Sequence, residues 1–147
     1  MRISTKGRYA LRLMIDLAEQ PTGAIISLKA ISARQGISVK YLEMIVKMLN
    51  RAGYVKSYRG KAGGYSLVAS PDTCTAGAII MAVEGSLAPV ACLASETNCQ
   101  RKDICKALPF WQGLDAVIDE YVNKTTLADL SNMDKTAHSA RALPAQE

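Results

Sequence analysis

Apolar residues recur every three or four positions along the first fifty residues, which is the spacing of a buried helical face. The pattern predicts helices over residues 6–19, 27–34 and 38–52, each beginning near a serine or threonine that can cap it. Two of these helices have a full apolar face, formed by Ala10, Leu13, Met14 and Leu17 and by Leu42, Ile45, Val46 and Leu49. Gly36 supplies the turn between the second and third helices.

Two short stretches of alternating apolar and polar residues, 54–58 and 65–68, follow the third helix. They flank the glycine-rich residues 59–64 (RGKAGG), which predicts a β-hairpin with a flexible basic tip. Two helices joined by a glycine-containing turn have the spacing of a helix-turn-helix, and the hairpin adds the wing of a winged helix. The Gly-Lys pair does not indicate a phosphate-binding loop, because that motif needs Gly at Val55 and Ser or Thr at Ala62.

Beyond residue 106, apolar side chains again recur at helical spacing, at Leu108, Trp111, Leu114, Ile118 and Tyr121. They predict a long amphipathic helix over residues 107–123, and the remaining chain is too short to cover its apolar stripe. A second copy of the chain is the simplest cover, so we expect a homodimer. The alternative is that the stripe packs entirely on the winged helix of its own chain.

Together these elements predict a mainly α fold with a small β-hairpin, a winged helix-turn-helix followed by a long C-terminal dimerisation helix. The predicted parts are a winged-helix DNA-binding domain over residues 1–85, a cysteine-bearing loop over 86–106, the dimerisation helix over 107–130 and a disordered tail over 131–147. The N-terminal apolar residues are spaced and no cleavage site follows them, so we expect no signal peptide, no membrane span and a cytoplasmic protein.

Charge is divided unevenly along the chain. Residues 1–65 carry 12 Lys and Arg against 3 Asp and Glu, a net charge of +9, whereas residues 66–147 carry 6 against 10, a net charge of −4. A segregated basic region favours a polyanionic partner, with an affinity that falls steeply as salt is added. With the winged helix it predicts binding to double-stranded DNA, although charge alone is equally consistent with a solvated, lysine-rich surface.

The third helix is the expected recognition helix, whose first residues meet base edges in the major groove. Its outward side chains suit this role, since Ser, Lys and Tyr can bind phosphates or guanine and Glu can accept from cytosine. An arginine at the wing tip suits a narrow minor groove, and a two-fold dimer suits a pseudo-palindromic operator. The alternative is an ordinary three-helix core with a polar surface. The expected DNA-contacting residues are Ser4, Lys6, Arg8, Ser38, Lys40, Tyr41, Glu43, Met44, Lys47, Arg59 and Lys61.

Three of the four cysteines, Cys92, Cys99 and Cys105, are clustered, and Cys74 is the fourth. Clustered thiols in a protein without a secretory signal more often hold metal or sense redox state than form structural disulfides. A disulfide between two of them, or three reduced thiols, remains the alternative. No nucleophile–base pair or paired carboxylates occur, and the single histidine, His138, lies in the polar tail, so we do not expect an enzyme.

Four motifs give the chain a family resemblance: the opening MRISTKGRYA, ISVKYLE at residues 37–43, RG and GGY around the wing tip, and VEG at residues 83–85. Over about residues 1–130 the chain resembles the Rrf-two (Rrf2) family of bacterial regulators, and it is most similar to the IscR-like branch of iron-sulphur cluster regulators. The resemblance implies a regulator of iron-sulphur cluster biogenesis genes. It also implies that Glu43 helps to separate the site preferences of the cluster-bound and cluster-free forms.

For the cysteines, the resemblance implies that Cys92, Cys99 and Cys105 ligate an iron-sulphur cluster, with 2Fe-2S favoured and 4Fe-4S as the alternative. IscR-like proteins have a histidine ligand three residues after the last cysteine, and this chain has Leu108 there. Another branch uses an acidic residue near the N-terminus, where this chain has Arg8. The fourth ligand therefore stays open among a partner-subunit residue, a small thiol, water, and the candidates Glu96, Asp103 and Cys74.

Other functions fit the same pattern. Inside the family, the alternative is a sensor of nitric oxide or iron. Outside it, the alternatives are a metal-free regulator of thiol redox state or cysteine metabolism and an adaptor that binds a metabolic enzyme and no DNA.

Overall fold

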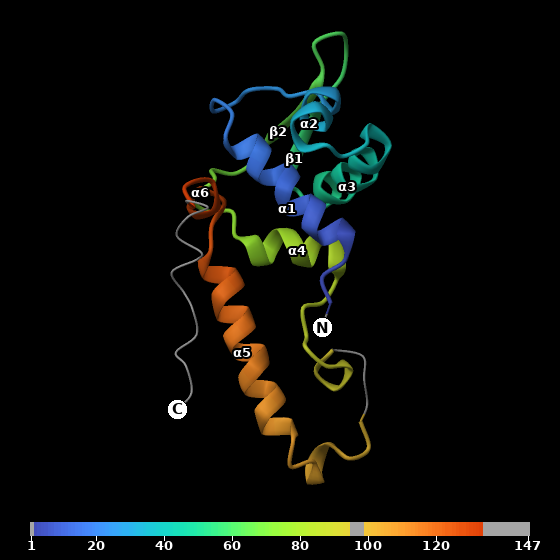
Figure 1. Ribbon diagram of the computed structural model, residues 1–147, viewed down its shortest axis with the longest axis vertical. Coiled ribbons are helices and arrows are strands. Elements are labelled where there is room, and N and C mark those ends of the chain that lie inside the picture. The colour runs from blue at the N-terminus through green and yellow to red at the C-terminus, as the bar shows by residue number, and fades with distance from the viewer. Residues whose placement is uncertain (1, 95–98, 134–147) are drawn as a thin grey trace.

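Three capped helices form the N-terminal half of the protein (Figure 1). The structure is a computed structural model that describes residues 2–94 and 99–133. α1 (Thr5–Ala18), α2 (Leu28–Gln35) and α3 (Val39–Arg51) each follow a serine whose hydroxyl oxygen accepts a hydrogen bond from the backbone of the first turn. Gly36 adopts the left-handed conformation, with φ 64°, and turns the chain from α2 into α3. The structure confirms the three predicted helices.

The apolar faces of α1 and α3 are buried as the sequence predicts. Leu13 and Met14 of α1 and Leu42 and Ile45 of α3 are fully enclosed, and α1 packs against α2, α3 and α4. α4 (Ala76–Glu84) closes the core with Ile79. Removal of this apolar surface from water is the main stabilising term of the domain.

The predicted hairpin is present after α3. β1 (Val55–Tyr58) and β2 (Gly64–Leu67) pair antiparallel, with Val55 opposite Leu67 and Tyr58 opposite Gly64. Tyr65 exchanges two backbone hydrogen bonds with Ile26, of 2.9 and 2.8 Å, which join the hairpin to the segment ahead of α2. The hairpin therefore projects as a wing beside the helix-turn-helix, as Figure 1 shows.

α5 (Leu108–Lys124) is the predicted long helix, and it extends away from the winged helix (Figure 1). It ends at Lys124 rather than continuing to residue 130. The chain then forms α6 (Leu127–Ser131), which packs on α1 and fully buries Leu127. A capping box between Thr126 and Asp129 begins the new helix. The tail predicted from residue 131 starts inside α6, and residues 134–147, with His138, lie outside the described residues.

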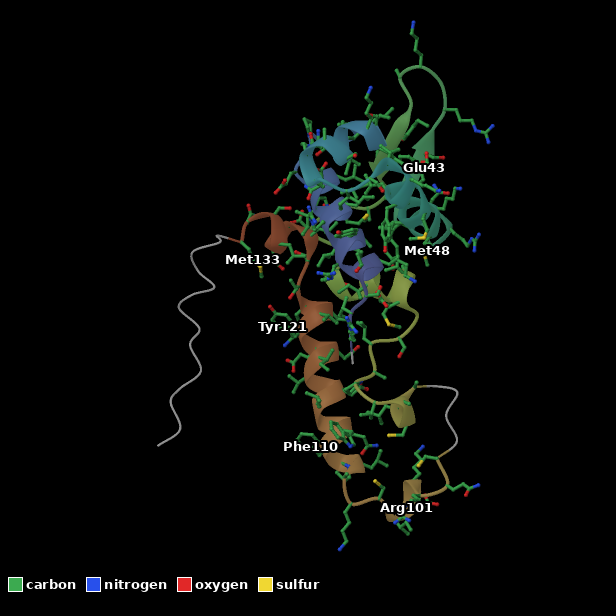
Figure 2. The ribbon with its side chains drawn as sticks, turned by 45° about the vertical axis from the view of Figure 1, so that its right-hand side comes forward. Glu43, Met48, Arg101, Phe110, Tyr121 and Met133 are labelled. Carbon is green, nitrogen blue, oxygen red and sulfur yellow. The ribbon has the colours of Figure 1, made fainter. Side chains whose placement is uncertain are left out.

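The single predicted stripe of α5 is divided over two faces. Leu108, Trp111 and Ile118 are partly buried, and α5 also packs on α4. A second row is exposed and consists of Phe110, Leu114, Val117 and Tyr121. In Figure 2 Phe110 lies near the far end of α5, and Tyr121 lies at the end of α5 that is closer to the winged helix. Within the described residues, no helix is long and apolar enough to cross a membrane.

An ion pair between buried Asp16 and exposed Arg34 fixes α2 against α1. Asp16 of α1 is 1% exposed and accepts hydrogen bonds from Arg34 Nη2 (2.6 Å), Arg34 Nε (3.0 Å) and Gln35 Nε2 (2.9 Å). Burial raises the pKa of this carboxyl, but the hydrogen bonds from Arg34 and Gln35 and the charge of Arg34 outweigh it, so the net pKa is lowered. The pair holds the end of α2 immediately before the turn into α3.

Loss of this pair is expected to destabilise the fold. Arg34→Ala leaves a buried carboxylate with Gln35 as its remaining side-chain donor, so the free energy of unfolding should fall by about 2 kcal/mol at neutral pH. Because the folded pKa of Asp16 is lowered, its contribution is complete above the usual value of 3.8 and is lost as pH falls through the lower folded value. Urea unfolding at neutral and acidic pH measures both effects.

The matched control is Asp72→Asn, which removes an exposed carboxylate and should leave stability nearly unchanged. Asp16→Asn should lose part of the acid sensitivity of the wild type. Equal stability of wild type and Arg34→Ala would contradict the assignment.

Candidate DNA interface and cysteine segment

The outer face of α3 carries four of the eleven residues expected to contact DNA. Lys40, Glu43, Met44 and Lys47 are exposed, while the face that they leave behind is buried in the core. Figure 2 shows Glu43 and Met48 along α3, on the side that lies below the wing. The burial pattern thus separates a core face from a polar face containing two lysines and a glutamate.

Two expected contacts of α3 have internal partners instead. Ser38 caps the helix, because its Oγ accepts from the backbone N–H of Tyr41 at 3.2 Å. Tyr41 is partly buried and packs edge to face on Tyr9 of α1, with ring centroids 5.4 Å apart. Ser38 therefore begins α3, and Tyr41 joins α3 to α1.

The wing carries its two expected basic residues in exposed positions. Arg59 and Lys61 lie in the turn between β1 and β2, where Gly60 has φ 102°. Gly64 lies so close to the backbone of Ile26 that a Cβ at this position would overlap the Ile26 carbonyl. Glycine is required there to keep the wing against the domain.

The first turn of α1 places the other expected contacts. Arg8 is exposed and donates to Thr5 Oγ1 at 3.1 Å, and Lys6 is partly buried. Ser4 is engaged within the protein, since its Oγ donates to Glu84 Oε1 and accepts from Gly7 N at 3.2 Å. The sequence reasoning missed Glu84, because no local pattern signals a partner that is so distant along the chain.

The cysteine segment, residues 86–106, runs between α4 and α5 with only two short 3-10 turns, η1 (Ala91–Leu93) and η2 (Lys102–Ile104), among its described residues. In Figure 1 it descends from α4 to the far end of α5, away from the wing. Cys92, Cys99 and Cys105 are free thiols and are partly buried. Three adaptable thiols on one irregular segment are a donor set that suits soft metal ions.

The structure does not gather these three thiols into a metal site within the described residues. Among residues 2–94 and 99–133, no group of three or more cysteine, histidine or acidic side chains is close enough to hold a metal ion. The donors fit an iron-sulphur cluster chemically, and the segment would have to rearrange to gather the three sulphurs. Glu96, one candidate for a fourth ligand, lies outside the described residues.

Cys74 occupies a different environment. It is buried at the start of α4, and its carbonyl accepts from Leu127 N at 2.8 Å. Burial raises the pKa of its thiol, which disfavours the thiolate that metals bind. The nine residues of α4 span about 13 Å and separate Cys74 from the cysteine segment. Cys74 is therefore poorly placed as a ligand.

Comparison with known proteins gives the family. The profile of Rrf2, described as "Iron-dependent Transcriptional regulator", matches residues 3–133. The chain belongs to the Rrf2 family. The resemblance noted from the sequence motifs is thereby confirmed.

Two kinds of relative are similar in sequence to this Rrf2 protein. It is 42% identical over 132 residues to the transcriptional regulator CymR of Bacillus subtilis, a match covering 90% of this chain and 91% of CymR. It is 39% identical over 132 residues to the transcriptional regulator IscR of Erwinia tasmaniensis, covering 90% of this chain and 79% of IscR. The family and both relatives are transcription regulators, a class that binds DNA. Sequence identity does not decide whether this chain is of the CymR kind or of the IscR kind.

Solved structures of the same relatives share the fold. The structure of CymR, named there the global cysteine regulator of B. subtilis, has a TM-score of 0.75 at 41% identity and covers 91% of this chain and 99% of its own. The structure of T. potens IscR has a TM-score of 0.71 at 34% identity and covers 100% of this chain and 94% of its own. The predicted winged-helix fold class is confirmed.

Proposed function

We propose that this Rrf2 protein is a homodimeric transcription regulator whose operator affinity is set by an iron-sulphur cluster on Cys92, Cys99 and Cys105. The observation that carries the proposal is the placement of three free thiols on one irregular segment that starts directly after α4. When bound, such a cluster supplies a redox-sensitive and oxygen-sensitive link between the three thiolates. The expected targets are genes of iron-sulphur cluster biogenesis.

On the DNA side, we assign base contacts to α3 and phosphate or minor-groove contacts to the basic residues around it. Lys40 and Lys47 suit phosphates or guanine, and Glu43 suits a cytosine amino group. Arg59 at the exposed wing tip suits a narrow minor groove. The strongly basic first half of the chain supports an affinity dominated by phosphate contacts.

A second function is favoured by one specific difference. Leu108 stands where IscR-like proteins have a histidine ligand, and Cys74 is buried with its thiol kept protonated. The alternative is a cysteine-metabolism regulator that uses the same thiols without metal, and the relative CymR is named the global cysteine regulator in its solved structure. The two functions share the DNA interface and differ in what the cysteine segment binds.

Native mass spectrometry of protein purified without oxygen separates the two functions. We expect a dimer carrying two-iron or four-iron clusters, and we expect Cys92→Ala, Cys99→Ala and Cys105→Ala each to remove at least most of the iron. Cys74→Ala is the matched control and should keep the cluster, because this thiol lies at the other end of α4.

A metal-free wild-type dimer under the same conditions would reject the cluster and support the metal-free function. Loss of iron in Cys74→Ala with a folded dimer would instead add the buried thiol to the ligand set.

Operator binding tests the DNA interface. Lys47→Ala and Arg59→Ala should each weaken binding by roughly fivefold and reduce the slope of log affinity against log salt by about one, because each removes one phosphate-directed charge. Fluorescence anisotropy with a duplex selected from a random pool measures both quantities. Lys124→Ala is the control, because this lysine is paired with Glu120 at the end of α5.

If the control weakened binding as much as the two test variants, the assigned face would be wrong. Absence of any sequence-selective binding would support the adaptor function instead.

A substitution in the exposed row of α5 tests whether the protein forms a dimer through this helix. Phe110, Leu114, Val117 and Tyr121 follow steps of three and four, the spacing with which two helices pack along a seam. Val117 is 64% exposed, and Val117→Glu should shift the protein to monomers because it places a charge in the seam. Val68→Glu is a matched control, since Val68 is 59% exposed on the winged helix. Sedimentation velocity distinguishes monomer from dimer, and a dimeric Val117→Glu protein would contradict this seam.

A further inference from the structure

The first turn of α1 has a second cap that comes from α4. Glu84 Oε1 accepts hydrogen bonds from Ser4 N at 3.2 Å and from Gly7 N at 3.0 Å, and it also accepts from Ser4 Oγ. A helix leaves its first four N–H groups without partners inside the helix, and its N-terminus carries partial positive charge. A carboxylate at this point satisfies donors that Ser4 alone cannot.

The absence of a side chain at Gly7 leaves room for this carboxylate. Gly7 is buried in α1, and a Cβ at this position would overlap Glu84 Oε1. Glycine in a helix interior lowers helix stability, so its presence here needs a compensating contact. The close approach of Glu84 to the α1 backbone is that contact.

Glu84 also lies at a boundary of the chain. It is the last residue of α4, and Gly85 follows in the left-handed conformation with φ 81°. The cysteine segment begins at the next residue. In Figure 1 the end of α4 lies beside the start of α1, and the segment continues from it towards the far end of α5.

The turn of α1 that Glu84 caps lies at the proposed DNA interface. Lys6 and Arg8 lie in the turn of α1 that Glu84 caps. If the end of α4 moves, Ser4 N loses its acceptor and Gly7 N keeps only the hydrogen bond to Ser4 Oγ, so this turn frays more readily. Fraying would remove the fixed positions of two basic side chains that are placed to meet phosphates.

We propose that Glu84 is a positioning residue that transmits the state of the cysteine segment to the DNA-facing first turn of α1. The inference rests on the proposed function, because it requires that the state of the segment alters operator affinity. It adds the residue through which that change passes.

A double-mutant cycle tests this link. Operator affinity is measured for the protein with native cysteines and for the Cys92→Ala/Cys99→Ala/Cys105→Ala protein, each combined with Glu84→Ala, Glu84→Gln or Gly7→Ala. Glu84→Ala removes the cap, Glu84→Gln keeps a neutral acceptor on the same stem, and Gly7→Ala displaces the carboxylate while leaving it in the chain. Glu19→Ala, which removes an exposed carboxylate at the other end of α1, is the matched control.

The measured quantity is the ratio of affinities between the two cysteine states. We expect a ratio of roughly tenfold in wild type and in Glu19→Ala, a ratio near one in Glu84→Ala and Gly7→Ala, and an intermediate ratio in Glu84→Gln. A role confined to stability would lower both affinities equally and leave the ratio unchanged. Hydrogen exchange of the Gly7 amide should accelerate in Glu84→Ala, which reports the loss of the cap in the folded protein.

Each outcome decides the inference. An unchanged ratio in Glu84→Ala and Gly7→Ala would overturn the link through Glu84 while leaving the proposed function intact. A ratio of one in wild type would overturn both, because no signal would pass from the segment to DNA. A ratio that falls to one in the test variants and persists in Glu19→Ala would support the link.

Discussion

The packing of α1 against four other helices determines where the functional residues of this protein lie. Leu13 and Met14 are fully enclosed, and α2, α3, α4 and α6 all contact this helix. Its polar contacts also hold neighbouring helices in place. Asp16 holds the end of α2, and Glu84 holds the first turn of α1 to α4. α3, which we propose as the recognition helix, and α4, which precedes the cysteine segment, are therefore both positioned by α1.

α5 lies outside this core, and that placement explains the division of the molecule into two ends. It packs on α4 and leaves an outer apolar row exposed, while the cysteine segment follows its length away from the wing (Figure 1). α4 ends at Glu84, directly before the cysteine segment, and it packs on both α1 and α3. It is therefore the helix that connects the segment to the winged helix.

Local sequence signals were sufficient to predict the three N-terminal helices and the wing, because capping serines, helical periodicity and the glycines of the turns act within a few residues. Long-range contacts were not predictable in this way. Asp16 with Arg34 and Ser4 with Glu84 join residues on different elements, and the burial of Tyr41 depends on Tyr9. The exposed row of α5 was only partly predicted, because the contact with α4 decides which of two adjacent apolar faces is covered. The break before α6 had a local signal, the capping box of Thr126 and Asp129, that was missed.

The central claim is that the state of three thiols at one end of the molecule sets DNA affinity at the other. The most direct test purifies the intact dimer without oxygen, selects its operator from random duplexes, and measures affinity for that operator before and after exposure of the same sample to oxygen. We expect a change of roughly tenfold that is absent when all three cysteines are replaced by alanine. Equal affinities before and after exposure, in a sample shown to have lost its cluster or oxidised its thiols, would contradict it.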